Sequence, residues 1–235
     1  MTSILLLGFF LGMRHALEAD HVAAVATLAT RNHGGWGAVF QGAVWGLGHT
    51  ITLFLAFSVV LFVDTVVPER LAQGLEAAVG AMLLVLGADL LRRMVRDRVH
   101  FHTHRHSDGR VHFHAHSHAG DPAPHGLDHE HDHPRRFPAR ALCVGMMHGL
   151  AGSAALILLT LGTLASPSAG LAYVGLFGLG STAGMALLSL AISVPLRGAR
   201  RFTWLLNSVH AVVAVATIAI GGLLVYENLW PGLLA

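Results

Sequence analysis

Six long apolar segments dominate this chain of 235 residues and limit the folds open to it. The hydrocarbon core of a bilayer is about 30 Å thick, and an α-helix needs about 20 apolar residues to cross it. Charged residues make up 12% of the chain, whereas a soluble domain has about 25%. We therefore predict an all-α integral membrane protein with six transmembrane helices, at residues 3–29, 37–63, 71–91, 139–165, 170–194 and 203–229.

An internal repeat relates the two halves of the chain. GMRHAL at residues 12–17 aligns with GMMHGL at 145–150, and WGLGHT at 45–50 aligns with FGLGST at 177–182. Because each half holds three helices, an odd number, the second half must be inverted in the membrane. Such repeats place a substrate site near the midplane, at their interface. We predict two inverted three-helix repeats, over residues 1–92 and 139–235, joined by a separate segment at 93–138.

The distribution of basic residues predicts the orientation. All fifteen are arginine, and thirteen of them lie in or beside the first, third and fifth connections between the predicted helices. Short loops rich in arginine stay on the cytoplasmic side of a membrane. We therefore expect a multi-pass protein of a bacterial-type cytoplasmic membrane, with residues 93–138 in the cytoplasm and both termini outside.

The stretch GMRHALEADH at residues 12–21 places ionisable groups inside the first apolar segment. Each such group costs at least ~2.5 kcal/mol to insert and usually marks an ion pathway. On a continuous helix His15, Glu18 and His21 share one face, and Arg14 can pair with Glu18 one turn later. Asp20 lies off that face. Either it orients a histidine from outside the site, or the helix is locally distorted.

Histidine recurs in other membrane segments. His49 is in the second, and His148 in the fourth is the repeat counterpart of His15. We expect the His148 ring to point inward, towards the other histidines. Imidazole and carboxylate together suit nickel, cobalt, zinc or copper. The candidate metal ligands are His15, Glu18, Asp20, His21, His49 and His148.

The segment at 93–138 is rich in histidine, mixed with aspartate and glutamate. This composition cannot build a packed core, so we expect a disordered loop. Its imidazoles favour metal buffering or sensing over a role as the transport site. The candidate buffering residues are His100, His102, His104, His106, His112, His114, His116, His118, His125, His129, His131 and His133.

HALEADH at residues 15–21 matches the His-x4-Asp-His signature of the nickel/cobalt permease superfamily (NiCoT/NicO). GHT at 48–50 resembles the second signature of that superfamily, and HGLAGSAA at 148–155 resembles its urease accessory nickel permease branch. The resemblance implies that His15, Asp20, His21 and His49 are needed for metal transport. LFGLGSTAGM at 176–185 lacks the acids of the third signature, and the chain has fewer helices than the usual eight of uptake permeases.

We therefore expect a secondary transporter, not an enzyme, that moves Ni²⁺ or Co²⁺ and holds no permanent cofactor. Ala19-Asp20 replaces the Pro-Gly of the efflux branch, which favours uptake, and efflux is the alternative. A membrane metalloenzyme of the histidine-box kind and a membrane-anchored metal buffer are alternatives from other classes. The chain has no Gly-x4-Gly-Lys-[Ser/Thr] phosphate loop. Expected partners are a divalent transition-metal ion, the lipid bilayer and cytoplasmic nickel-handling proteins, but not nucleic acid.

Overall fold

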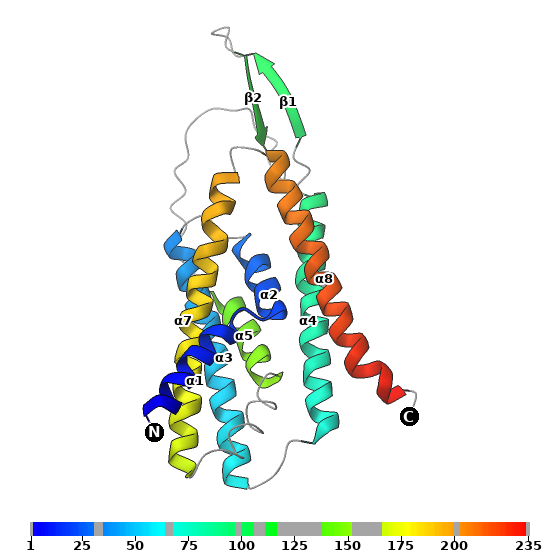
Figure 1. Ribbon diagram of the computed structural model, residues 1–235. Helices are drawn as coiled ribbons and strands as arrows, with labels where there is room; N and C mark the ends of the chain where they lie inside the picture. Colours follow the sequence, from blue (N-terminus) through cyan, green and yellow to red (C-terminus); the bar gives the residue numbers. More distant parts are fainter. Residues whose placement is uncertain are drawn as a thin grey trace.

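The computed structural model describes residues 2–30, 35–63, 68–96, 100–105, 111–116, 138–151, 166–199 and 203–233. Within these residues the chain forms seven helices and one β-hairpin (Figure 1). In chain order they are α1 (Thr2–His15), α2 (Ala19–Ala29), α3 (Gly35–Val63), α4 (Glu69–Arg96), β1 (His100–Arg105), β2 (Val111–His116), α5 (Ala139–Ala151), α7 (Pro167–Ala199) and α8 (Thr203–Leu233).

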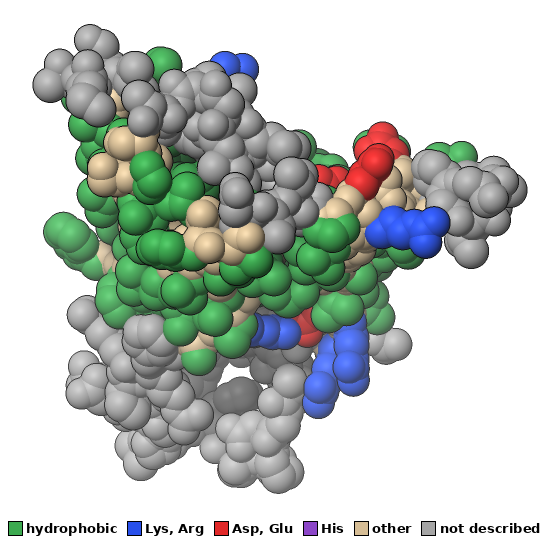
Figure 2. Space-filling model, turned by 90° about the horizontal axis from the view of Figure 1, so that it is seen from below, with side chains coloured by type: hydrophobic (Ala, Val, Ile, Leu, Met, Phe, Trp, Pro, Cys, Tyr) green, Lys and Arg blue, Asp and Glu red, His purple; other side chains and the backbone are tan. Residues whose placement is uncertain are grey.

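Four helices are long and apolar enough to cross a membrane, and they correspond to the second, third, fifth and sixth predicted spans. The qualifying segments are Trp36–Val63, Glu69–Arg96, Pro167–Leu196 and Trp204–Leu229. Their outward surfaces carry large apolar side chains such as Phe62 and Val212. In Figure 2 hydrophobic side chains make up most of the coloured surface. So much exposed apolar surface suits lipid and not water, as expected for a multi-pass membrane protein.

The first predicted span is not one continuous helix. Helix α1 ends at His15, and the N–H groups of Leu17 and Glu18 donate to carbonyls three residues back, at 2.9 and 3.0 Å. Glu18 is extended, and its carbonyl accepts the N–H of Val22 at 2.9 Å as α2 begins. The prediction of a single helix over residues 3–29 was therefore wrong. The tight turn keeps the backbone hydrogen-bonded, which makes a break tolerable inside a membrane protein.

The fourth predicted span begins as α5, which is described as far as Ala151; residues 152–165 lie outside the described part of the chain. The short helices α2 and α5 occupy the middle of the bundle, with α3 and α7 on one side and α4 and α8 on the other (Figure 1). Two short helices therefore meet where the long ones surround them.

Glycine allows the short helices α1 and α5 to approach the long helices α7 and α3 closely. A Cβ atom on Gly12 of α1 would collide with the Phe177 carbonyl of α7, and one on Gly145 of α5 would collide with the Trp45 carbonyl of α3. Small residues serve this purpose in membrane helices. The two contacts involve positions that the sequence repeat aligns, so α1 sits against α7 much as α5 sits against α3.

Hydroxyl groups also connect these helices through hydrogen bonds. The Thr50 and Thr182 hydroxyls lie 3.1 Å apart, between α3 and α7. Thr52 donates to the Met146 carbonyl at 2.9 Å, which joins α3 to α5, and Ser181 donates to the Gly12 carbonyl at 3.1 Å, which joins α7 to α1. Each of these bonds joins a helix of the first half of the chain to a helix of the second half.

Two described parts of the histidine-rich segment, His100–Arg105 and Val111–His116, differ from the expectation of disorder. Strands β1 and β2 pair antiparallel and extend beyond one end of the helices (Figure 1). The physical reason is an alternation of histidine with Phe, Thr, Val or Ala, which is a strand period and outweighs the polar composition. Half of the twelve loop histidines lie outside the described residues: His106, His118, His125, His129, His131 and His133.

Candidate metal centre

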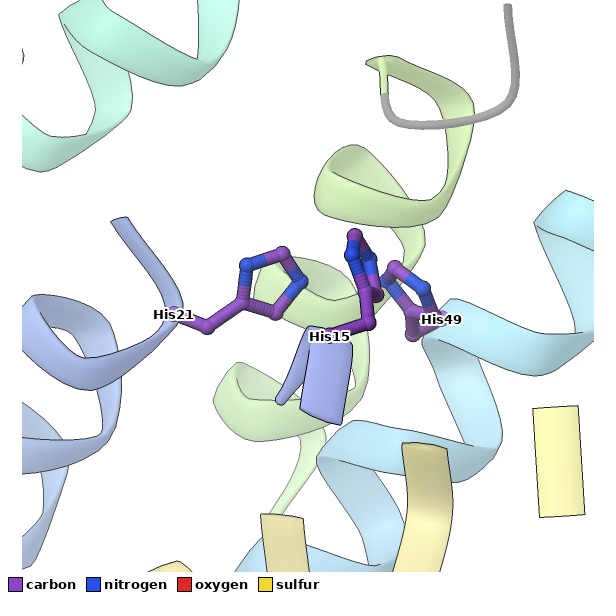
Figure 3. A group of neighbouring side chains, drawn as sticks. All are labelled: His15, His21 and His49. Carbon is purple, nitrogen blue, oxygen red and sulfur yellow. The ribbon is translucent and has the colours of Figure 1, made fainter. Parts of the chain in front are cut away.

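Three histidines from three different helices face one another beside the break between α1 and α2. The ring centroids of His15 and His21 are 4.5 Å apart, and each lies 5.3 Å from the centroid of His49. Figure 3 shows the rings gathered around one small space, with His21 coming from α2 and His49 from α3. Each ring offers one nitrogen within 4.8 Å of the other two.

His148 joins this group from α5. Its side chain is 1% exposed, and its ring centroid is 4.9 Å from that of His21. The Nε2 atom of His148 is 3.7 Å from Oδ2 of Asp20. The ring therefore lies on the inner side of the bundle, where the repeat placed it. Asp20, His21 and His148 form a second set of ligand atoms within 4.8 Å of one another.

An oxygen atom lies close to Nδ1 in three of the four imidazole rings. Nδ1 of His15 is 2.8 Å from the Glu18 carboxylate, and Nδ1 of His21 is 2.9 Å from that of Asp20. Nδ1 of His148 is 3.1 Å from the carbonyl of Val144. When Nδ1–H donates to oxygen, a neutral imidazole presents a lone pair on Nε2. Metal-binding histidines in proteins are commonly held in this way.

The remaining ring nitrogens are buried and have no hydrogen-bond partner in the described residues. They are Nε2 of His15, His21 and His148 and both ring nitrogens of His49. Buried polar atoms normally have a partner, because leaving them without one costs free energy. A divalent ion would satisfy several at once. Ligand atoms about 2.0–2.1 Å from an ion lie about 3–4 Å apart. The ligand atoms within each set, which lie within 4.8 Å of one another, therefore need to approach by at most about 1–2 Å.

The two acids of the motif occupy different positions. Asp20 lies in the first turn of α2, where the helix dipole stabilises a negative charge. It contacts His21 through one carboxylate oxygen and faces His148 with the other. The helix is therefore locally distorted, the second alternative left open for Asp20, and the distortion turns Asp20 inward, where it bonds to His21. The Glu18 side chain is 57% exposed and contacts Nδ1 of His15 from outside, instead of forming the expected ion pair with Arg14.

Two aromatic side chains that the sequence analysis did not select complete the walls of the site. The Trp45 ring is fully buried, with its centroid 5.4 Å from that of His21 and 5.5 Å from that of His148. Phe177 lies 5.3 Å from His15. Trp45 and Phe177 are the first residues of the second aligned motif pair, and that equivalence was the available signal.

A multi-pass helical membrane protein with four inward-facing imidazoles and a carboxylate has the features expected of a membrane protein for transition-metal ions. The chain belongs to the NicO family, described as high-affinity nickel-transport protein, whose model matches residues 1–227. It is also 32% identical over 200 residues to the urease accessory protein UreH of Bacillus sp. (strain TB-90), which covers 83% of this chain and 78% of that protein. No solved structure matches the chain.

The family is one of transport proteins and not of enzymes. The histidine-box metalloenzyme is therefore set aside, and the resemblance found in the motifs agrees with the family match over almost the whole chain. The functions of the individual site residues stay predictions.

Proposed function

We propose that the protein is a secondary permease that carries Ni²⁺, with Co²⁺ as a second candidate, across the cytoplasmic membrane. The observation that carries this proposal is the set of buried imidazole nitrogens that have no hydrogen-bond partner within the described part of the chain, beside the carboxylate of Asp20. The proposed cargo-binding residues are His15, Asp20, His21, His49 and His148, with Glu18 orienting His15. Ni²⁺ suits such a nitrogen-rich set of ligands.

The membrane potential is the proposed driving force for uptake. A potential of 100 mV is worth ~2.3 kcal/mol per elementary charge, or about 4.6 kcal/mol for a divalent cation. The arginine distribution supports an orientation with the hairpin in the cytoplasm and both termini outside. Uptake is the favoured direction because the first motif reads Glu-Ala-Asp before His21, and efflux is the alternative.

We further propose that residues 1–92 and 139–235 are inverted three-helix repeats that meet at the metal site, giving six membrane segments in all. Matched contacts support this arrangement. Gly46 of α3 lies against Thr182 of α7, while Gly178 of α7 lies against Thr50 of α3. Exchange of the two halves carries one contact into the other, as a twofold relation requires.

A flux assay tests the proposed function. In sealed proteoliposomes with an internal Ni²⁺-sensitive dye, we expect Ni²⁺ to enter faster when the imposed potential is negative on the side of the hairpin. Competition with Co²⁺ and Zn²⁺ ranks the cargo, and protease access to the hairpin defines the polarity. Flux no greater than that of protein-free vesicles, from a folded and inserted protein, would contradict the proposal. Flux that accumulates Ni²⁺ only on the other side would establish efflux.

The hairpin and its flanking segments are proposed to buffer metal at the cytoplasmic side. The strand pairing sets His100 opposite His116, His102 opposite His114 and His104 opposite His112. Residues directly opposite one another on antiparallel strands share a face, so six histidine positions lie on one side of the hairpin. Cross-strand imidazoles of this kind are suitable ligands for Ni²⁺ or Zn²⁺. Cytoplasmic nickel-handling proteins are the proposed recipients.

Removal of the twelve loop histidines should separate buffering from transport. With all twelve replaced by serine, we expect fewer Ni²⁺ ions bound per chain, because the loop ligands are lost, but measurable flux, because the site between the helices is intact. A matched control exchanges His114 with its neighbour Phe113, which keeps the histidine count and breaks one cross-strand pair. Equilibrium dialysis measures the bound ions. Complete loss of flux in the folded serine variant would show that the loop belongs to the pathway.

A further inference from the structure

The ligand atoms of the candidate centre fall into two overlapping sets. The first set is His15, His21 and His49, and the second is Asp20, His21 and His148. The first comes wholly from α1, α2 and α3, whereas the second combines α2 with α5 from the other half of the chain. The two sets share the ring of His21.

The shared ring limits how many ions the centre can hold. Nδ1 of His21 is hydrogen-bonded to Asp20, which leaves Nε2 as its one free nitrogen. A single lone pair binds one ion at a time. Two divalent ions in neighbouring sets of this size would also repel each other strongly in a medium of low dielectric constant. One ion per chain is therefore the largest occupancy that the geometry supports.

The sets also respond differently to movement of the two halves. Transporters of inverted repeats expose their site to alternate sides when one repeat moves against the other. Such a movement leaves the first set intact, because all three of its ligands lie in residues 1–92. It changes the distance from His148 to Asp20, now 3.7 Å, because these residues lie in different halves.

We propose that the two sets are successive binding positions, called stations, for one ion. His21 passes the ion from His15 and His49 at the first station to Asp20 and His148 at the second. This inference rests on the proposed function and deepens it. The ion stays bound to His21 while His15 and His49 are exchanged for Asp20 and His148, so the cation is not released bare into the apolar interior. The second station is complete when the two halves of the chain are together, and its ligands move apart when the halves separate. Handover requires the two stations to have similar affinities.

A double-mutant cycle on Ni²⁺ binding tests the two stations. The background is the full chain with its twelve loop histidines replaced by serine, purified in detergent and titrated with Ni²⁺ by calorimetry. His49→Ala removes one ligand of the first station and His148→Ala one of the second. Because each variant keeps one complete station of similar affinity, we expect each to bind one ion, with affinity lowered about threefold or less. The double variant and His21→Ala should each bind at least about 100-fold more weakly.

Three results would overturn the inference. The first is a stoichiometry of two Ni²⁺ ions per chain in the background protein. The second is a loss of Ni²⁺ affinity in either single variant as large as that of His21→Ala. The third is a loss of binding free energy in the double variant equal to the sum of the two single losses. The last two results would indicate one site. His49→Asn and His148→Asn replace any alanine variant that fails to fold, and His210→Ala on α8 serves as the control. The inference and the proposed function can fail separately. If Ni²⁺ binding follows the pattern expected for the cycle but vesicles show no Ni²⁺ flux, only the proposed transport is contradicted.

Discussion

Replacing His21 with alanine is expected to reduce Ni²⁺ flux to below about one hundredth of the wild-type rate. Altering even a residue that only orients a ligand typically costs 10–100-fold in metal affinity, and His21 is proposed to bind the ion directly. Its ring lies against those of His15, His49 and His148, and its side chain is 2% exposed. His15→Ala and His49→Ala should also abolish flux, because each removes a ligand from the first station. Initial rates in proteoliposomes measure the effect.

The control for this series is His210→Ala, which removes a histidine from membrane helix α8 outside the two ligand sets. Its flux should stay close to that of the wild type, which separates loss of a ligand from the general effect of removing an imidazole. Equal protein incorporation and an unchanged size-exclusion profile establish that each variant has inserted. Near-normal flux in any two of the three site variants would show that this cluster is not the transport site.

Gly145→Ala is expected to destabilise the protein, although alanine is the better helix former. The added Cβ would collide with the Trp45 carbonyl, a backbone atom that no rotamer change can move. Overpacking of this kind costs about 1–3 kcal/mol. The displaced α5 would also carry His148, three residues later, away from Asp20. We expect a lower midpoint of thermal unfolding in detergent, together with weaker Ni²⁺ binding.

Gly175→Ala is the matched control on α7. Nothing lies within 4 Å of a Cβ placed there, so only the helix-propensity gain of about 0.5–1 kcal/mol remains. The two substitutions are chemically identical and should shift the melting temperature in opposite directions. Gly12→Ala, at the repeat counterpart of Gly145, should destabilise in the same way. Stabilisation by Gly145→Ala would mean that α3 and α5 are not in close contact.

Much of the architecture could be predicted because it depends on local composition. The length of an apolar run determines whether a helix can cross a bilayer, and four predicted spans correspond to the long helices α3, α4, α7 and α8. The motif at residues 15–21 identified the family, and the repeat indicated which side His148 would face. The alternation within the hairpin was also visible in the sequence, but its polar composition favoured a prediction of disorder.

The break between α1 and α2 could not be predicted from local sequence. Ala16, Leu17 and Glu18 all favour helix, and no glycine or proline marks the turn. The helix ends there because of the neighbours of this segment: Gly12 lies against α7 and Thr27 is hydrogen-bonded to Thr217 of α8. Helix propensity is a weak preference that tertiary contacts override.

The sequence by itself determined which chemical groups the motifs bring into the membrane: His15, Glu18, Asp20 and His21 in the first apolar segment, with His49 and His148 in two others. Only the tertiary structure decided how these groups are distributed between the two ligand sets and the outside of the site. It turned Asp20 inward, left Glu18 on the outside and made His21 common to two sets of ligands. The physical reason is that periodicity describes positions along one helix, whereas a metal site depends on distances between helices, and those are set by long-range packing at residues such as Gly12 and Gly145.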